Sequence, residues 1–435
     1  MKKLNVQKVF CFLSFLFILS CCIFYGTRFI KLYLENKKVE TEEKNSLVKV
    51  IRENNADNES FEIMNGKNYF TGSANTNYLE YSNILWRIIK VNGDNSLTAI
   101  SEYSITSLAH GKNTSFKDSR INTWLNTTTS EYSGILEKSL NNIETYLQKT
   151  ETCNDTYNEL SNDLCKNVTT DAYFSLLSIP DYLNTGSKDS YLNNNEYFYL
   201  GNNNDEDKTW YVNDDGKATP NVGDEIIGIR PVITIKANID YISGTGTKED
   251  PYKIEKENGL FGSYVKLGND TWRIYEINND EVKLMLNSTI PDITKEYSSK
   301  NSYYDDYSKN STAYYLNHTF LDSLSYKDII KETNWSNGYY NSSNTFDYTT
   351  SLETTINSKV ALLSIGNIFL NPELTNYSTM TGTKEKASSI YVIQKNKRVF
   401  SKQISTKTSI VPTIAVDKNI LKKGNGTIDS PFEME

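Results

Sequence analysis

Histidine is nearly absent from this sequence of 435 residues, which contains only His110 and His318. Histidine is the usual general base near neutral pH and a common zinc ligand, so two copies leave few candidates for either role. Neither histidine has a cysteine, serine or carboxylate at the spacing of a recognisable catalytic motif. We therefore predict no catalytic residue, no metal site and no cofactor from the sequence.

Cysteine is also scarce, and its five copies fall into two groups. Cys11, Cys21 and Cys22 lie in an apolar stretch near the N-terminus. Cys153 and Cys165 are the only cysteines in the rest of the chain, and polar residues surround both. Two isolated loop cysteines in an exported protein are typical of a disulfide, so we expect these two to be bonded. The alternative is an ordinary reduced pair.

An excess of positive charge is missing too. The chain has 46 Lys and Arg against 54 Asp and Glu, and its formal net charge is -8. No basic stripe follows the N-terminal residues, although proteins that bind nucleic acid usually carry one. Nucleic acid is therefore not a predicted partner.

One long uncharged run stands at the N-terminus, from Val9 to Thr27. A helix of that length spans about 30 Å, the thickness of the hydrocarbon core of a bilayer. No cleavage site of the Ala-x-Ala type follows the run. We predict an uncleaved membrane anchor over residues 1–28, with the N-terminus inside and the body outside the cytoplasm. Two alternatives stay open: a cleaved lipoprotein, because Ile18–Cys21 resembles a lipobox, and a buried core helix.

The segment that follows the run, residues 29–66, is charged and rich in helix-forming residues. Its apolar residues are scattered and form no sustained heptad. We expect a partly helical stalk that holds the rest of the chain away from the bilayer.

The rest of the chain is rich in tyrosine, with 31 copies, and aromatic residues make up 12% of the sequence. This is too aromatic for a disordered chain. Tyrosine, threonine and isoleucine favour strands, whereas asparagine, glycine and serine favour turns. The composition therefore indicates a body rich in β-strands and loops.

A pair of linked motifs occurs twice. Gly228–Ile235 reads GIRPVITI and precedes GTGTKEDPY at Gly244–Tyr252; Ser409–Val416 reads SIVPTIAV and precedes GNGTIDSPF at Gly424–Phe432. Other landmarks recur in the same order at separations of 180 to 186 residues. The matched pairs are Trp86 and Trp272, Leu176 and Leu362, Pro231 and Pro412, and Gly244 and Gly424. This regularity predicts a duplication, with module one over 67–257 and a diverged module two over 258–435.

Each module shows the same local patterns near its start. Trp86 and Trp272 sit in alternating strands and are expected to be core residues, and a turn then leads to a second strand of a hairpin. A short helix follows, with Ser119 or Ser311 as its N-cap. We therefore predict an α+β fold of two tandem, β-rich modules behind a transmembrane helix, each module closing its own core.

The order of these motifs resembles a known family. Leu85–Ile89, Leu125–Asn126, Leu176–Ser178, Gly228–Ile233 and Gly244–Tyr252 together look like the exported or membrane-anchored repeat proteins of Firmicutes that form the DUF6273 group. The resemblance covers about residues 68–255 and implies a core similar to C-type lectins or to sulfatase-modifying factors. It implies no reaction that could be transferred to any residue.

Module two departs from this pattern. Val411 replaces the arginine that corresponds to Arg230, and Ser430 replaces the aspartate that corresponds to Asp250. We interpret Arg230 as a structural ion pair or backbone anchor, beside the structural prolines Pro231 and Pro412. Module two has no arginine at the position that corresponds to Arg230.

Few residues indicate a binding site. Trp335 has no apolar neighbours at strand or helix spacing, so it is the predicted exposed aromatic contact. The acidic stretch Asn203–Asp207 could suit calcium, but it lacks the EF-hand spacing and is better interpreted as a solvated loop.

Two functional hypotheses remain. The first is a bacterial cell-surface protein, anchored through its N-terminal helix, that binds a glycan or protein ligand outside the cell or acts in adhesion. The alternative is an envelope enzyme or an enzyme accessory related to sulfatase-modifying factors. A cleft that gathers carboxylates with His110 or Arg230 would favour the enzyme, whereas a tyrosine-lined outer surface would favour binding.

Overall fold

The computed structural model describes residues 46–126, 136, 139–257, 259–293, 309, 311–336, 339–340, 346–347, 355–382, 389–403, 406 and 408–434. Most of the regular structure in these residues is β-sheet. No helix among them is long and apolar enough to cross a membrane. The predicted α+β class is therefore wrong, because strands dominate the described residues. The anchor predicted over residues 1–28 lies outside the described residues.

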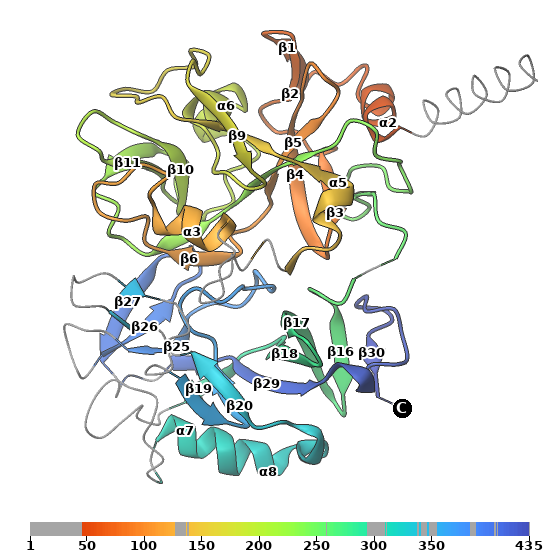
Figure 1. Cartoon of the computed structure of the whole chain (residues 1–435), viewed down its shortest axis with the longest axis vertical. Coiled ribbons are helices and arrows are strands. Elements are labelled where there is room, and N and C mark those ends of the chain that lie inside the picture. The colour runs from red at the N-terminus through yellow and green to blue at the C-terminus, as the bar shows by residue number, and fades with distance from the viewer. Residues whose placement is uncertain are drawn as a thin grey trace, which may run out of the picture.

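Module one contains two main sheets, which occupy the upper part of Figure 1. In the first, neighbouring strands run in the order β14 (Val232–Ile235), β5 (Leu97–Ser101), β4 (Ile84–Val91), β3 (Tyr78–Tyr81) and β15 (Tyr252–Lys253). This sheet also includes β1 (Phe61–Met64), β2 (Lys67–Phe70) and β7 (Leu147–Gln148). The second has the order β12 (Ala218–Asn221), β11 (Thr209–Val212), β10 (Phe198–Asn203), β13 (Ile227–Ile229) and β6 (Thr106–Leu108).

Module two repeats both strand orders in the lower part of Figure 1. Its first sheet runs β29 (Pro412–Asp417), β18 (Glu281–Leu286), β17 (Asp270–Asn278), β16 (Tyr264–Leu267) and β30 (Phe432–Glu433), with β24 (Val360–Leu362) beside β29. Its second runs β27 (Val399–Gln403), β26 (Ser389–Ile393), β25 (Tyr377–Gly382), β28 (Thr408–Ile410) and β19 (Ile290–Ile293). Even the parallel pairs correspond, since β3 with β15 matches β16 with β30. No strand pairing among the described residues joins the two halves of the chain.

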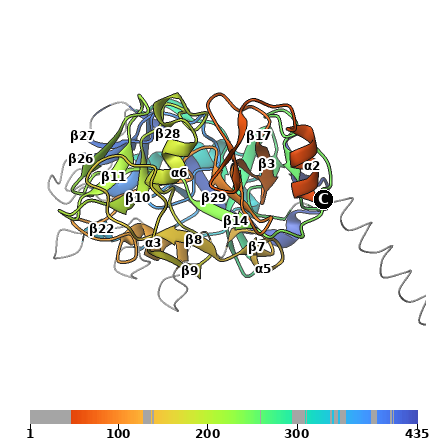
Figure 2. The same ribbon diagram turned by 90° about the horizontal axis from the view of Figure 1, so that it is seen from above.

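Shorter elements complete the described fold. They are α2 (Leu47–Asn54), α3 (Arg120–Asn126), α5 (Ile143–Tyr146), β8 (Thr150–Cys153), β9 (Val168–Ala172), α6 (Ile179–Asn184), η1 (Ser187–Asp189), α7 (Thr312–Tyr315), η2 (Leu316–Phe320), α8 (Leu321–Ser323), η3 (Lys327–Ile329), β20 (Thr333–Ser336), β21 (Tyr339–Tyr340), β22 (Phe346–Asp347), β23 (Thr355–Ser358) and η5 (Lys418–Ile420). Seen from above, β8 and β9 lie together along one edge of the molecule (Figure 2).

Local chemistry explains several of these elements. The Ser119 hydroxyl accepts a hydrogen bond from the Asn122 amide at 3.0 Å and caps α3. The Ser311 hydroxyl accepts one from the Tyr314 amide at 3.1 Å and caps α7. Each cap satisfies an amide that the first helical turn leaves without a partner. Both caps agree with the sequence prediction.

The predicted stalk is wrong from Ser46 onward, and its residues 29–45 lie outside the described chain. Leu47, Val48 and Ile51 of α2 are almost completely buried in the largest hydrophobic cluster. The Leu47 amide also donates to the Ile239 carbonyl at 3.0 Å. One apolar face of α2 is covered by the body, so this segment belongs to the fold.

The largest hydrophobic cluster contains residues of both modules. It joins module-one residues such as Leu79 and Trp124 to module-two residues such as Phe369 and Val411. Trp124 illustrates the junction, because its indole nitrogen donates to the Gly366 carbonyl at 2.9 Å. The prediction that each module closes its own core is therefore wrong for this largest cluster, which the modules share, although two further clusters each lie within one module.

Candidate functional site

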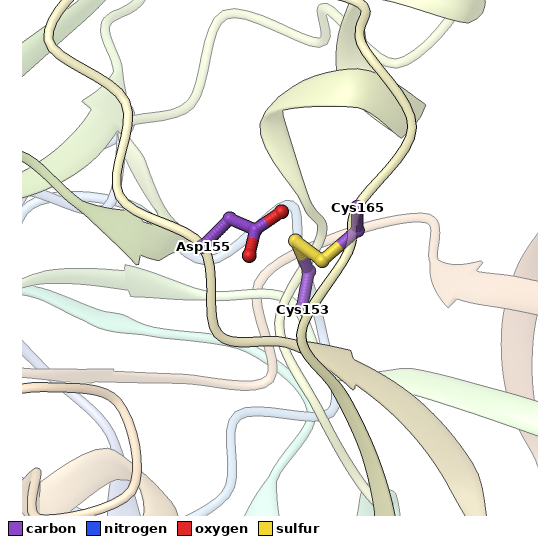
Figure 3. A group of neighbouring side chains, drawn as sticks. All are labelled: Cys153, Asp155 and Cys165. Carbon is purple, nitrogen blue, oxygen red and sulfur yellow. A yellow bond between two sulfur atoms is a disulfide. The ribbon is translucent and has the colours of Figure 1, made fainter.

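The Cys153–Cys165 disulfide is present, which confirms the prediction. It closes a loop at the end of β8, with the Cα atoms 5.8 Å apart (Figure 3). The Asp155 carboxylate lies beside it and accepts hydrogen bonds from the amides of Lys166 at 2.6 Å and Asn167 at 3.0 Å. Both sulfurs are consumed by the bond, so this trio of two cysteines and an aspartate offers no thiolate ligands for a metal. The disulfide and the hydrogen bonds of Asp155 together fix the conformation of the loop.

Trp86 and Trp272 are fully buried on corresponding strands. The indole of Trp86 donates to the Tyr81 carbonyl at 3.1 Å, whereas that of Trp272 donates to the Tyr326 hydroxyl at 3.1 Å. The two tryptophans therefore fill equivalent places in the sheets with different hydrogen-bond partners.

The prediction that Trp335 is an exposed aromatic contact is wrong. Only 2% of the residue is accessible, and its indole donates to the Ser358 carbonyl at 2.9 Å. The reason is a strand pairing that local sequence does not show: β20 pairs with β23 and sets Trp335 opposite Ile356. The Lys283 ammonium lies 5.2 Å from the ring. Trp335 belongs to the core of module two.

Arg230 is completely buried and binds main-chain carbonyls. Its Nε donates to Ser101 at 2.9 Å and its Nη1 to Leu192 at 2.5 Å, while the guanidinium lies 4.9 Å from the Phe198 ring centre. Burial lowers the pKa of Arg230. The adjacent Pro231 accepts from the Ser101 amide at 3.1 Å, and Pro412 begins β29 opposite Leu362. Arg230, Pro231 and Pro412 therefore have structural roles, through hydrogen bonds to the main chain and positions beside or within strands.

His110 is also fully buried, and burial lowers its pKa to about 4. Neither His110 nor Arg230 lines the hollows described below.

The repeated Gly-x-Gly-Thr segments form loops with the same backbone hydrogen bonds. The amides at positions 245 and 246 donate to the Asp250 carbonyl at 2.9 and 3.0 Å, and those at positions 425 and 426 donate to the Ser430 carbonyl at 3.0 Å each. Gly244 and Gly424 have positive φ, and a Cβ at either would lie about 2 Å from a proline carbonyl oxygen. Glycine is therefore required at both positions.

These two loops line one groove between the modules. The groove has a volume of about 550 Å³, which is within the range of small-ligand sites. The first loop contributes Lys248 to Pro251 and the second contributes Gly426 to Asp429. Other parts of the wall come from the turn at Asn83, from Tyr103, from Tyr264 and from the segment 369–372.

Two lysines in the groove have different partners. Lys253 lies 3.8 Å from the Glu80 carboxylate. Lys248 instead donates to the Tyr103 hydroxyl at 2.8 Å, and this hydrogen bond raises the pKa of Lys248. Lys248 is therefore held in place by a hydroxyl group and not by a carboxylate.

Arg273 forms part of the groove wall and connects three segments. Its Nε donates to the Gly262 carbonyl at 2.9 Å, its Nη1 to Leu370 at 2.6 Å, and its Nη2 to Asn83 of module one at 3.2 Å. The guanidinium lies 4.5 Å from the Tyr264 ring centre. Burial lowers the pKa of Arg273. Its donors are directed at the main chain, so it fixes the groove walls.

A turn of module two docks into module one and sets the position of the groove walls. The Asn396 carbonyl accepts from the Tyr197 amide at 2.8 Å, and the Val399 amide donates to the Ile226 carbonyl at 2.9 Å. Between them, Lys397 lies 3.9 Å from the Glu196 carboxylate, with both side chains buried. We call residues 396–399 the docking turn.

A second hollow, of about 640 Å³, lies beside α5. All the residues that line it belong to module one, including Tyr146, Lys236, Asp240 and Ile242. It has one tyrosine and neither repeated loop, so the groove between the modules is the better candidate site.

Comparison with protein-family models, with curated proteins and with solved structures found no match. The resemblance to the DUF6273 group therefore stays a prediction.

Sequence reasoning missed the groove residues Tyr103, Lys248, Ile428 and Asp429. One signal pointed toward them, because three of the four stand in the repeated loops. The sequence showed that the two loops correspond, but not that they line the same groove.

Proposed function

We propose that this chain is a ligand-binding protein that works outside the cytoplasm, and that its ligand occupies the groove between the modules. The observation that carries the proposal is the shared wall: two corresponding loops, 180 residues apart in sequence, line one hollow of ligand size. Tyrosines, charged side chains and apolar residues alternate along that wall, as they do in many ligand sites.

Two further observations support the proposal. The Cys153–Cys165 disulfide fits an oxidising compartment such as the cell envelope or the extracellular space. In addition, Ile428 stands at the groove with 64% of its surface exposed, although backbone hydrogen bonds hold the loop that carries it. This side chain offers an apolar contact in the wall of the groove.

A ligand screen with a groove-filling variant tests the proposal. The full chain is applied to arrays of glycans and peptides, together with Ile428→Trp and the control Ile63→Trp. Ile63 is 77% exposed on β1, away from the groove, so it controls for an added surface tryptophan. We expect a ligand whose binding is lost in Ile428→Trp and kept in Ile63→Trp. A ligand that both variants bind as well as the parent protein does would contradict the proposed site.

The proposed compartment has its own test. Cells are treated with a thiol-alkylating reagent before lysis, and the Cys153–Cys165 peptide is then examined by mass spectrometry. We expect the disulfide-bonded form, and a fully alkylated pair would place the body in a reducing compartment.

A further inference from the structure

We propose that the ligand of the groove is a short peptide segment that carries both acidic and basic side chains. This inference rests on the proposed function and adds the chemical class of the ligand. It comes from the charges of the groove and from how few of them are paired.

The groove contains charges of both signs, and most lack an ionic partner. Glu80 and Lys253 lie 3.8 Å apart and form the only ion pair between groove residues in the described part of the chain. Lys248 is bound to a tyrosine hydroxyl, and no described cation pairs with Glu249, Asp250 or Asp429. Unpaired groups of opposite sign therefore share a hollow of about 550 Å³.

Charge complementarity separates the candidate ligands. A purely anionic ligand would suit Lys248 but would be repelled by the three carboxylates, and a purely cationic ligand would be repelled by the lysine. A neutral sugar could form hydrogen bonds with these groups but would supply no opposite charge to any of them. A peptide with acidic and basic side chains can pair with both kinds of group at once.

The remaining wall suits the rest of such a peptide. Tyr103 and Tyr264 offer aromatic rings and Ile428 an exposed aliphatic side chain. Ile428 occupies the loop position that Lys248 occupies in the other loop, since both stand four residues after the first glycine. The same loop backbone thus presents a cation from one module and an apolar group from the other. A mixed peptide matches this difference, because it also combines charged and apolar side chains.

Both presenting loops are fixed before a ligand arrives. Their tips are held by corresponding backbone hydrogen bonds, and each loop is also tied to the first sheet of its own module, with the amide of Tyr78 donating to Gly246 and that of Tyr264 to Gly426 at 2.8 Å each. Lys248 is restrained further by Tyr103. Groups that are already ordered lose little conformational entropy on binding.

The test uses the full chain and short fluorescent peptides in four classes: mixed-charge, acidic, basic and uncharged, all with the same apolar content. Fluorescence anisotropy measures their affinity, and a panel of neutral oligosaccharides is measured beside them. We expect mixed-charge peptides to bind about tenfold more tightly than the other classes, because two or three exposed charge pairs contribute about 1 kcal/mol or less each. Their affinity should fall as ionic strength rises.

Two variants locate the binding. Lys248→Met and Asp429→Asn should each weaken the mixed-charge peptides severalfold, whereas the matched controls Lys166→Met and Asp171→Asn, both exposed near the disulfide loop, should not. If neutral oligosaccharides bind and are displaced by Ile428→Trp while no peptide binds, the peptide inference is overturned and the proposed function stands. If no probe binds, or if binding ignores every groove variant, both are overturned.

Discussion

Removal of the Lys397 ammonium should destabilise the protein by about 3–5 kcal/mol at pH 7, because it leaves a buried carboxylate without its cation. In the structure the Lys397 and Glu196 side chains are 1% and 5% exposed and 3.9 Å apart. Lys397 also donates to the Pro372 carbonyl at 3.1 Å, and Glu196 accepts from the Ser104 amide at 2.7 Å. The pair lies where the docking turn enters module one, so its loss acts on the contact between modules.

The pH dependence of this effect follows from Glu196. Burial raises the pKa of Glu196 even beside Lys397, and removal of the lysine raises it further. Glu196 of the Lys397→Met variant can then take up a proton in the folded state at a pH above the ordinary carboxyl range. The folded variant therefore binds more protons than its unfolded chain above that range, so its stability rises as pH falls toward it. We expect the difference from the parent protein to shrink over the same interval.

Denaturant unfolding followed by tryptophan fluorescence measures these differences for Lys397→Met, Glu196→Gln and the double variant. Each single variant leaves one buried charged side chain without its counter-charge. The double variant should therefore lose less unfolding free energy than the sum of the two single variants. The exposed pair of Lys67 and Glu151, 3.5 Å apart, provides the control, and Lys67→Met should change stability by less than about 1 kcal/mol. A cost below about 1 kcal/mol for Lys397→Met, or simple additivity in the double variant, would refute the reasoning.

Three further predictions use the same unfolding assay. Replacement of both Cys153 and Cys165 by serine should cost about 3 kcal/mol, because the bond closes a loop of 12 residues, and reduction of the parent protein should reproduce the loss; an unchanged midpoint would contradict it. Trp335→Ala should cost about 3–5 kcal/mol as a large-to-small core substitution, and a change below about 1 kcal/mol would restore the exposed position that the sequence suggested. Burial lowers the pKa of His110 from 6.5 to about 4, so the unfolded chain binds more protons between these values and stability should fall by about 3 kcal/mol as pH drops through that window. His110→Gln should flatten this part of the profile, and an identical slope in both proteins would argue against it.

Local patterns were sufficient for elements whose partners are close in sequence. The alternation around Trp86 and the turn at Asn92–Gly93 predicted β4 and β5, which pair as a hairpin. The caps at Ser119 and Ser311 were also readable, because a cap needs only its own first helical turn. Cys153 and Cys165 were predictable because no other cysteines compete for pairing in that part of the chain.

Positions that depend on distant partners were not readable. Trp335 looks isolated among polar residues, yet β23 covers it from more than 20 residues away. The charged segment before module one resembles a stalk, but three of its apolar residues complete a core built from both modules. The docking turn has the composition of an ordinary hairpin turn, and no residue near Lys397 in sequence indicates that Lys397 pairs with Glu196. Each error concerns burial, which is set by tertiary contacts.

The duplication explains why the candidate site lies between the modules and not within one of them. Each module ends in the same glycine-rich loop, tied to the same kind of strand, so docking has brought two copies of one structure to the same groove. The two turns meet, since the Asn396 side chain donates to the Asp214 carboxylate at 3.1 Å, but their other contacts differ: the docking turn bonds to Tyr197 and Ile226 of module one, whereas its counterpart at Asn213–Lys217 bonds to Tyr182 of its own module. Equivalent loop positions therefore face the groove in different surroundings. The difference between Lys248 in one loop and Ile428 in the other therefore affects one wall alone, and under the proposed function it would let the groove distinguish the two ends of a ligand.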